Sequence, residues 1–338
     1  SLKIMEGLIK DLKNILSKKK RIAITTHTNP DGDAIGSSLA LFLLFKKMDL
    51  DVKVITPNQH PEFLNWVPGC DEIIIYENNQ KFAGEIINNS DTIFTLDFND
   101  LKRCGNISEN INPNTQNLVM IDHHQSPSNY AKIMFSNPEI SSTCELVYII
   151  AEKLGLKKLI DKDIATCIYL GMMTDTGSFQ YNGVNGDTHK ILSFLLDKGI
   201  KQSEIYNNIY NSNTLSKLKI LGCAINNLSL IHNKNASYSF LTKEDLNKND
   251  YKKGDSEGIV NYGLTMKNID FTAIFIEDEN EADLIKISFR SKNNFPCDKF
   301  AKKYFFGGGH KNAAGGKYEG NIENAILKFK SSLNEFKH

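Results

Sequence analysis

The stretch Leu118-Val119-Met120-Ile121-Asp122-His123-His124 decides how this sequence is interpreted, because four apolar residues end abruptly in three side chains that handle metals or protons. Packing gives no reason for that change at the end of a buried strand. Such a triplet can give one imidazole, His123, to a metal and leave His124 to meet a substrate, while Asp122 orients them. Taken alone, it also fits an Asx turn with solvated histidines.

The same construction, an apolar strand followed by ligand-type side chains, occurs twice upstream. Residues 21–26 are rich in β-forming residues and lead directly to His27. Residues 92–96 form a second apolar run, which ends in Asp97. Because ligands collect at the carboxyl ends of parallel strands, we expect His27, Asp97 and Asp122 at one edge of a sheet.

Strands alternate with helical segments through the first half of the chain. Residues 51–56 and 72–76 are further short strands, and residues 34–45 are apolar nearly all round, as in a helix buried against a sheet. This alternation predicts an α/β fold with a parallel sheet and helices on both faces. Residues 2–21 predict an amphipathic helix and not a signal peptide.

The length of 338 residues suits two domains. The number of lysine and arginine residues (40) equals the number of aspartate and glutamate residues (40). The chain therefore lacks the excess of positive charge that is typical of proteins that bind long nucleic acids. Any nucleic-acid substrate should therefore be short. The asparagine-rich segment 207–214 marks a candidate boundary, and strands at 238–241, 271–275 and 285–289 predict a smaller α/β domain beyond it.

The six cysteines are scattered without a C-x-x-C pair, which is typical of a reducing cytosol and predicts a cytoplasmic protein. No apolar run reaches membrane-spanning length, so we expect no membrane partner. A homodimer is compatible with the sequence.

Six side chains in the first half can ligate metal: His27, Asp31, Asp33, Asp97, His123 and Asp175. They are enough for two divalent ions if one aspartate bridges. Mixed imidazole and carboxylate ligation without thiolate favours manganese, with magnesium or cobalt as alternatives. Two such ions can activate a water for in-line displacement at phosphorus, so hydrolysis of a phosphate ester is the expected reaction.

Each of the four aspartates also has a purely structural interpretation. Asp31 and Asp33 could cap the following helix, Asp97 could be a solvated strand end, and Asp175 could only bond backbone at a helix terminus. Finding all of them after apolar elements within one predicted domain favours the metal site over four unrelated turns.

A glycine-rich segment near the end, Gly307-Gly308-Gly309-His310, predicts a loop whose backbone amides approach an anion, although it lacks the Walker spacing. Upstream lies Arg290-Ser291, after a predicted strand. Arginine is rare in this chain, since only residues 21, 103 and 290 are arginine. A guanidinium can form two parallel hydrogen bonds to a phosphate group. A surface salt bridge is the alternative for Arg290.

Together these motifs resemble the DHH phosphoesterase superfamily. The segments THTNPDGDA (26–34), TLDFND (95–100), IDHH (121–124) and MTDTGSF (173–179) resemble its four ordered signatures. SFRSK (288–292) and GGGHKNAAG (307–315) resemble the DHHA1 substrate-binding domain. The resemblance implies a DHH catalytic domain at 1–210, a connecting helix at 211–226 and a DHHA1 domain at 227–338.

The resemblance also implies roles for individual residues. One metal would be held by His27, Asp31 and Asp97, and the other by Asp33, Asp97, His123 and Asp175. Asp97 would bridge the two ions. Asp122 would support His124, which would touch the scissile phosphate and assist the leaving group. Arg290, Ser291, Gly307, Gly308, Gly309 and His310 would bind the far end of the nucleotide.

Within the superfamily, a compact two-domain chain resembles members that degrade short RNA oligonucleotides and dephosphorylate 3′-phosphoadenosine 5′-phosphate. Alternatives are a phosphodiesterase for linear or cyclic dinucleotides, a single-strand exonuclease of the RecJ type and a nucleotide-binding regulator without catalysis. Two positions depart from the pattern: Gln180 stands where arginine is usual, and Phe306 stands where a fourth glycine is usual.

Overall fold

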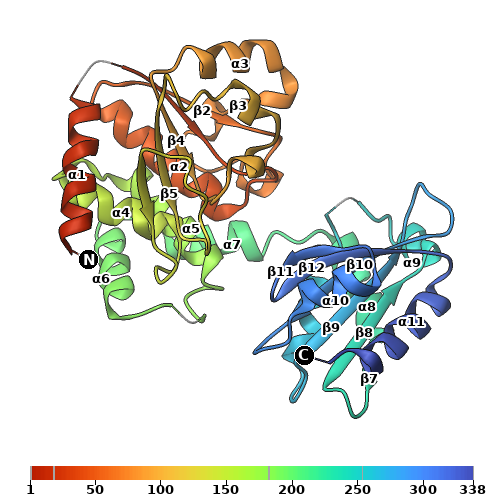
Figure 1. Cartoon of the computed structure of the whole chain (residues 1–338). Coiled ribbons are helices and arrows are strands. Elements are labelled where there is room, and N and C mark those ends of the chain that lie inside the picture. Colours follow the sequence, from red (N-terminus) through yellow and green to blue (C-terminus); the bar gives the residue numbers. More distant parts are fainter. Residues whose placement is uncertain (1, 18–19, 182, 253, 338) are drawn as a thin grey trace. The chain divides into compact units, whose positions relative to one another are not determined.

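The computed structural model describes residues 2–17, 20–181, 183–252 and 254–337, except for the side chains of residues 2–4 and 310. The chain divides into two compact units, Ser1–Ser212 and Asn213–His338. Each unit has a six-stranded sheet of its own (Figure 1). None of the helices in the described ranges has the length and apolar character that a membrane crossing requires.

The sheet of the first unit is parallel throughout, with the strand order β3-β2-β1-β4-β5-β6. Its strands are β1 (Arg21–Thr25), β2 (Asp51–Thr56), β3 (Ile74–Ile75), β4 (Thr92–Leu96), β5 (Asn117–Asp122) and β6 (Ile133–Ser136). The order reverses between β1 and β4, where the connections leave for opposite halves of the sheet. Such a switch point leaves a crevice at the carboxyl ends of the two strands.

Helices cover both faces of this sheet, as predicted (Figure 1). They are α1 (Leu2–Leu16), α2 (Gly32–Lys47), α3 (Gln80–Asn88), α4 (Thr143–Lys153), α5 (Lys162–Asp175), α6 (Gly186–Leu196) and α7 (Gln202–Tyr210). Short 3-10 helices are η1 (Glu62–Leu64), η2 (Cys70–Glu72), η3 (Tyr76–Asn78), η4 (Leu101–Asn110) and η5 (Lys157–Leu159). One face packs on α1, α2 and α4, and the other packs on α3 and η4.

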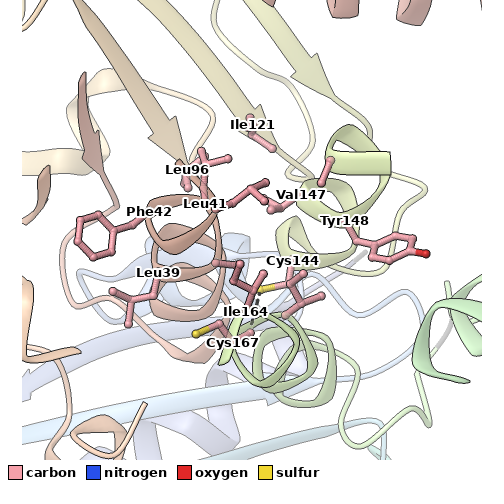
Figure 2. Close-up of a cluster of buried hydrophobic side chains, with 14 of the residues drawn as sticks. Leu39, Leu41, Phe42, Leu96, Ile121, Cys144, Val147, Tyr148, Ile164 and Cys167 are labelled. Carbon is pink, nitrogen blue, oxygen red and sulfur yellow. Dashed lines mark hydrogen bonds between the residues drawn. The ribbon is translucent and has the colours of Figure 1, made fainter. Parts of the chain in front are cut away.

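Helix α2 is apolar nearly all round because it lies between the sheet and α5. Figure 2 shows side chains of α2, α4 and α5 in this core, among them Leu39, Val147 and Ile164. Gly36 permits the close approach, since a Cβ there would lie 2.5 Å from the carbonyl oxygen of Cys167. The packing brings the start of α2 and the end of α5 together, and both carry predicted ligands.

The sheet of the second unit is mixed, with the order β11-β12-β10-β9-β8-β7 and one parallel pair, β8 with β9. Its strands are β7 (Ser229–Ile231), β8 (Ala236–Leu241), β9 (Phe271–Glu277), β10 (Leu284–Ser291), β11 (Gly308–His310) and β12 (Ala313–Glu319). Its helices are α8 (Leu215–Asn226), α9 (Lys243–Lys248), η6 (Ile259–Thr265), α10 (Cys297–Tyr304) and α11 (Ile322–Glu335). An aromatic core joins one face to α10 and α11, while α8 and η6 cover the other.

The α/β fold class is confirmed, and two local predictions need correction. The strand expected at 72–76 is only Ile74–Ile75, because 3-10 turns occupy the residues on either side. The glycine-rich segment is a β-hairpin, β11 with β12, and not a loop. Helix α8 packs on β8 and η6 within the second unit. The functional bounds at 210 and 226 remain predictions.

We predict that Gly36→Ala destabilises the first unit by about 1–3 kcal/mol, because the new methyl group overpacks the contact between α2 and α5. Gly7→Ala is the matched control: it lies inside α1 with nothing within 4 Å of the added Cβ, so it should stabilise the unit by about 0.5–1 kcal/mol. The chain has one tryptophan, Trp66, and its fluorescence during urea unfolding reports on this unit alone. Equal midpoints for the two variants would contradict the packing argument.

Candidate metal centre

The carboxyl ends of three strands bring predicted site residues to one edge of the first sheet. His27 follows β1, Asp97 follows β4 directly, and Asp122 is the last residue of β5. Strands β1 and β4 are the pair at which the strand order reverses. The predicted ligands are therefore gathered at the switch point, where α/β sheets bind their ligands.

Asp97 lies at the centre of the cluster. Its Oδ2 is 3.5 Å from Nε2 of His27, and its Oδ1 is 3.8 Å from Nε2 of His123. The hydroxyl of Thr143 donates to Oδ1 at 2.9 Å. The side chain is almost wholly buried, and the backbone has a φ of +65°, a region that aspartate tolerates better than most residues. One carboxylate thus faces histidines on two sides.

His27, Asp31 and Asp97 form the first group of potential ligands. Nε2 of His27 is 4.0 Å from Oδ1 of Asp31, while Nδ1 lies 2.8 Å from the carbonyl oxygen of Thr28. When Nδ1 donates to that carbonyl, Nε2 is the ligand atom. Burial acts to lower the pKa of His27, but its contact with Asp97 and the charge of Asp31 outweigh it and raise the pKa.

Asp31 is also the N-cap of α2, and its Oδ1 accepts from the amides of Asp33 and Ala34. The capping and ligand interpretations of Asp31 are therefore compatible, since the carboxylate does the first and faces His27 as well. Asn58 holds the loop between His27 and Asp31. The side-chain oxygen of Asn58 accepts from the amide of Asn29 at 2.6 Å, and its side-chain nitrogen donates to Oδ1 of Asn29 at 2.8 Å.

Asp33, His123 and Asp175 form the second group. Nε2 of His123 is 3.0 Å from Oδ2 of Asp175 and 3.9 Å from Oδ2 of Asp33. The fully buried carboxylate of Asp33 also accepts the amides of Thr143 and Cys144 at 2.7 and 2.9 Å, at the start of α4. The positive, amino-terminal end of α4 stabilises the negative charge of the Asp33 carboxylate.

Asp122 and His124 form a tight pair beside these groups. Nδ1 of His124 lies 2.6 Å from Oδ1 of Asp122, and the amide of His124 donates to Oδ2 at 3.1 Å. The aspartate is fully buried, whereas the imidazole is 25 % exposed. This contact fixes the proton of His124 on Nδ1 and orients the ring.

The charges at the centre are poorly balanced within the chain. Burial is the main cause that raises the pKa of Asp33 well above its usual value, and the charges of Asp97 and Asp175 raise it further. Burial acts likewise on Asp97, but the contact and charge of His27 and the charges of the neighbouring histidines lower its pKa below the usual value. Burial would lower the pKa of His123, yet Asp175 and the other carboxylates raise it to about 10.

The residues fit a divalent cation. Among the described residues, a third group of potential ligands consists of Asp97, His123 and His124. Within each of the three groups the ligand atoms lie within 4.8 Å of one another, and Asp97 and His123 each belong to two groups. The donors are imidazole nitrogens and carboxylate oxygens, which suit manganese, magnesium or zinc. A cation between the carboxylates would relieve the repulsion that raises the pKa of Asp33. The Asp and His clusters are therefore able to hold metal.

The predicted binding residues of the second unit lie at the end of β10 and in the adjacent hairpin. The half-buried Arg290 donates from Nη1 to the carbonyl oxygen of Phe289 at 2.9 Å, and burial lowers its pKa. Ser291 is buried, and its hydroxyl donates to the carbonyl oxygen of Phe295 at 2.7 Å, so this side chain holds the following turn. The side chain of His310 lies outside the described part of the structure.

The three glycines of the hairpin differ in what they permit. A Cβ at Gly307 would overlap the carbonyl oxygen of Gly315, and Gly309 has a φ of +146°. Gly308, in contrast, has open space at its Cβ position. Phe306 is exposed and has a φ of +48°, so the position where a glycine is usual keeps a backbone conformation that favours glycine.

Sequence reasoning missed Thr143, which binds both Asp97 through its hydroxyl and Asp33 through its amide. The available signal is the run Ser141-Ser142-Thr143 before α4, whose residue types are typical of a helix N-cap. Ser142 is indeed the cap, because its side chain accepts from the amide of Glu145. The same run thus starts a helix and supports the ligands.

Two family models match the chain. The DHH family N-terminal domain matches residues 21–172, and the DHHA1 domain matches residues 233–336. The first match contains β1 to β6, with five of the six potential metal ligands named from the sequence. The second contains the strands β8 to β12.

Similar proteins are known by sequence and by structure. The "Bifunctional oligoribonuclease and PAP phosphatase NrnA" of Bacillus subtilis is 26% identical over 90% of this chain and 91% of its own. An exopolyphosphatase-related protein from Bacteroides fragilis is 42% identical, with a TM-score of 0.93 over 97% of this chain and 96% of its own. RecJ of Thermus thermophilus, solved in complex with Mn2+, shares the fold, with 13% identity, a TM-score of 0.52 and coverage of 99% of this chain and 55% of its own.

The family matches, the 42% identity to a solved relative over nearly the whole chain and the order of the motifs agree with one another. The chain therefore belongs to the DHH family of phosphoesterases, with a DHHA1 domain in its second unit.

Proposed function

We propose that this protein is a two-metal phosphoesterase that hydrolyses short oligoribonucleotides and 3′-phosphoadenosine 5′-phosphate. The observation that carries the proposal is the place of Asp97, whose two carboxylate oxygens face His27 on one side and His123 on the other. A carboxylate in that position can bridge two ions. The curated relative from Bacillus subtilis, which is named for both activities, supports this choice of substrates.

In this proposal His27, Asp31 and Asp97 hold one ion, and Asp33, Asp97, His123 and Asp175 hold the other. We take the ions to be Mn2+, with Mg2+ or Co2+ able to replace it. Bound ions of this kind lower the pKa of a shared water and neutralise charge on the oxygens of the phosphate. Thr143 and the first amides of α4 fix the carboxylates of Asp97 and Asp33 before metal arrives.

The pair of Asp122 and His124 acts on the substrate itself. Because Nδ1 of His124 is engaged by Asp122 at 2.6 Å, Nε2 is the atom through which His124 contacts the phosphate and assists the leaving oxygen. Proton transfer to the leaving group therefore needs both residues.

The second unit binds the remainder of the substrate in this proposal. Arg290 supplies a guanidinium and the β11–β12 hairpin, with Gly307, Gly308, Gly309 and His310, supplies backbone amides. Ser291 holds the turn between them through Phe295 and Asn312. A neutral chain with this limited set of anion contacts suits short strands better than long ones. The cytosol, where thiols stay reduced, is the proposed location.

The rivals differ in substrate or in catalysis. A phosphodiesterase for linear or cyclic dinucleotides would use the same ligands, as would an exonuclease of the RecJ type. A regulator that only binds nucleotides would not need the Asp122–His124 pair. The relative from Bacteroides fragilis adds inorganic polyphosphate to the substrates worth testing, because its name refers to exopolyphosphatase.

We predict that the purified protein with Mn2+ releases mononucleotides from dinucleotides and short RNA, and phosphate from 3′-phosphoadenosine 5′-phosphate. The rate should fall as RNA length increases, because few contacts are available to hold a long strand. Chromatographic product profiles over a series of RNA lengths, cyclic dinucleotides and polyphosphate give the measurement. A preference for cyclic dinucleotides or polyphosphate, or indifference to length, would replace the proposed substrates.

We predict that Asp97→Ala lowers turnover more than about a hundredfold, because even mutation of a group that supports a metal ligand causes a loss of roughly 10- to 100-fold. Asp187→Ala is the control, since Asp187 lies on α6 with its side chain 82% exposed. Initial rates with saturating Mn2+ make the comparison. Full activity of Asp97→Ala would remove the proposed site.

We predict two manganese ions per chain, and loss of both activity and ion on treatment with EDTA. At a free concentration about one hundred times the dissociation constant, a bound ion stabilises the folded state by about 2.7 kcal/mol, so Mn2+ should shift the unfolding of Trp66 to higher urea. Equilibrium dialysis gives the stoichiometry. A single ion in the active protein would contradict the bridging role of Asp97.

We predict that Asp122→Asn lowers kcat by about 10²- to 10⁴-fold while Mn2+ stoichiometry stays at the wild-type value, because the amide no longer fixes the tautomer of His124. Single-turnover rates and dialysis on the same preparation separate the two effects. If Asp122→Asn loses manganese in proportion to activity, the residue supports the ions and not His124.

A further inference from the structure

Arg103 is one of three arginines in the chain, and its guanidinium is unusual. Nη1 is buried and has no hydrogen-bond partner among the described residues. None of the ion pairs seen in the described ranges includes Arg103. Buried donors, above all charged ones, are nearly always paired, so this atom needs an explanation.

The backbone of Arg103 lies beside the candidate metal centre. Its carbonyl oxygen accepts from the amide of Thr28 at 2.8 Å, and Thr28 is the residue whose own carbonyl contacts the ring of His27. A Cβ at Gly105 would lie 3.0 Å from Cγ2 of Thr28, so the two segments are closely packed. Arg103 is thus joined to His27 through one intervening residue.

The segment that carries Arg103 also reaches the loop after His124. It begins at Asp97, and Asn99 donates to the carbonyl oxygen of Gln125 at 2.8 Å. The amide of Ser128 in turn donates to the carbonyl oxygen of Asn99 at 2.8 Å. Residues 97–105 are therefore bonded on one side to the His27 loop and on the other to the loop that follows the histidine pair.

The other two arginines have partners within the chain. Arg21 lies 3.9 Å from a carboxylate oxygen of Asp91 at the opposite, amino end of β1, and Arg290 donates to the carbonyl oxygen of Phe289. Arg103, in contrast, has a buried Nη1 with no hydrogen-bond partner among the described residues, and its backbone is bonded to the loop that follows His27. A guanidinium is planar and matches two phosphate oxygens, which makes phosphate the anion best suited to it.

We propose that Arg103 is a substrate-binding residue whose guanidinium donates to a non-bridging oxygen of the phosphate at the metal centre. Within the proposed function, Arg103 supplies positive charge to the phosphate whose leaving group His124 assists. The contact strengthens as charge builds on the phosphate oxygens, so the residue contributes to kcat as well as to binding. The inference requires only that the centre accept a phosphate group.

The test measures binding of inorganic phosphate to the Mn2+-loaded protein by isothermal titration calorimetry. Arg103→Gln should weaken phosphate binding by roughly 10- to 100-fold, the range for hydrogen bonds to a charged group. Arg103→Lys keeps the positive charge but loses the planar pair of donors, so its phosphate affinity should lie between those of the wild type and Arg103→Gln. Arg21→Gln is the matched control and should bind phosphate as the wild type does.

A second measurement separates binding from structural support. In Arg103→Ala, added guanidinium ion at concentrations far below those that unfold proteins should restore part of kcat/KM in a saturable way, because it can occupy the vacated space. Manganese stoichiometry and the urea midpoint of Trp66 should match the wild type. A residue that only supports the fold would give lower midpoints and no rescue.

Wild-type phosphate affinity in a folded, manganese-loaded Arg103→Gln would overturn the inference. If Arg103→Gln fails to fold or to bind manganese, Arg103→Lys decides, and wild-type phosphate affinity in that variant overturns the inference equally. Failure of the proposed function looks different: the wild type would bind phosphate in a manner that depends on Arg103 and yet hydrolyse neither short RNA nor 3′-phosphoadenosine 5′-phosphate.

Discussion

The buried carboxylate of Asp97 is the group on which the rest of the centre depends. It stands directly after β4, at the reversal of strand order, and its oxygens lie 3.5 Å from His27 and 3.8 Å from His123. In water such a charge is easily solvated, but here it is almost wholly buried. Its environment therefore has to supply positive charge and hydrogen bonds, and the histidines, Thr143 and a metal are the available sources.

Helices α2, α4 and α5 hold the carboxylates of the centre in fixed positions. Gly36 allows α2 to pack closely on α5, which sets Asp33 at the start of one helix near Asp175 at the end of the other. The amides of α4 then bond the carboxylate of Asp33. Three helices and three strands thus fix side chains that would repel one another without a cation, and the stability for this arrangement comes from the apolar core behind it.

The second unit has an aromatic core and a glycine-rich hairpin in place of a cluster of ionisable side chains. Its core is built largely from phenylalanines, among them Phe271, Phe289 and Phe329, which pack between the sheet and α10 and α11. The glycines of the β11–β12 hairpin allow backbone to approach backbone, as the overlap of a Cβ at Gly307 with Gly315 demonstrates. Rigid packing on one side thus supports a hairpin in which Gly308 and Gly309 are exposed.

The sequence by itself determined the parallel α/β fold and the gathering of the six potential ligands, because apolar periodicity and strand ends are local properties of the chain. It did not reveal that Thr143 binds two of the aspartates or that the glycine-rich segment pairs as a hairpin. Nor did it reveal that Nη1 of Arg103 is buried with no hydrogen-bond partner in the part of the chain that the structure describes. Those features depend on which residues distant in sequence meet, and on how much water is left between them. Only the tertiary structure decides both.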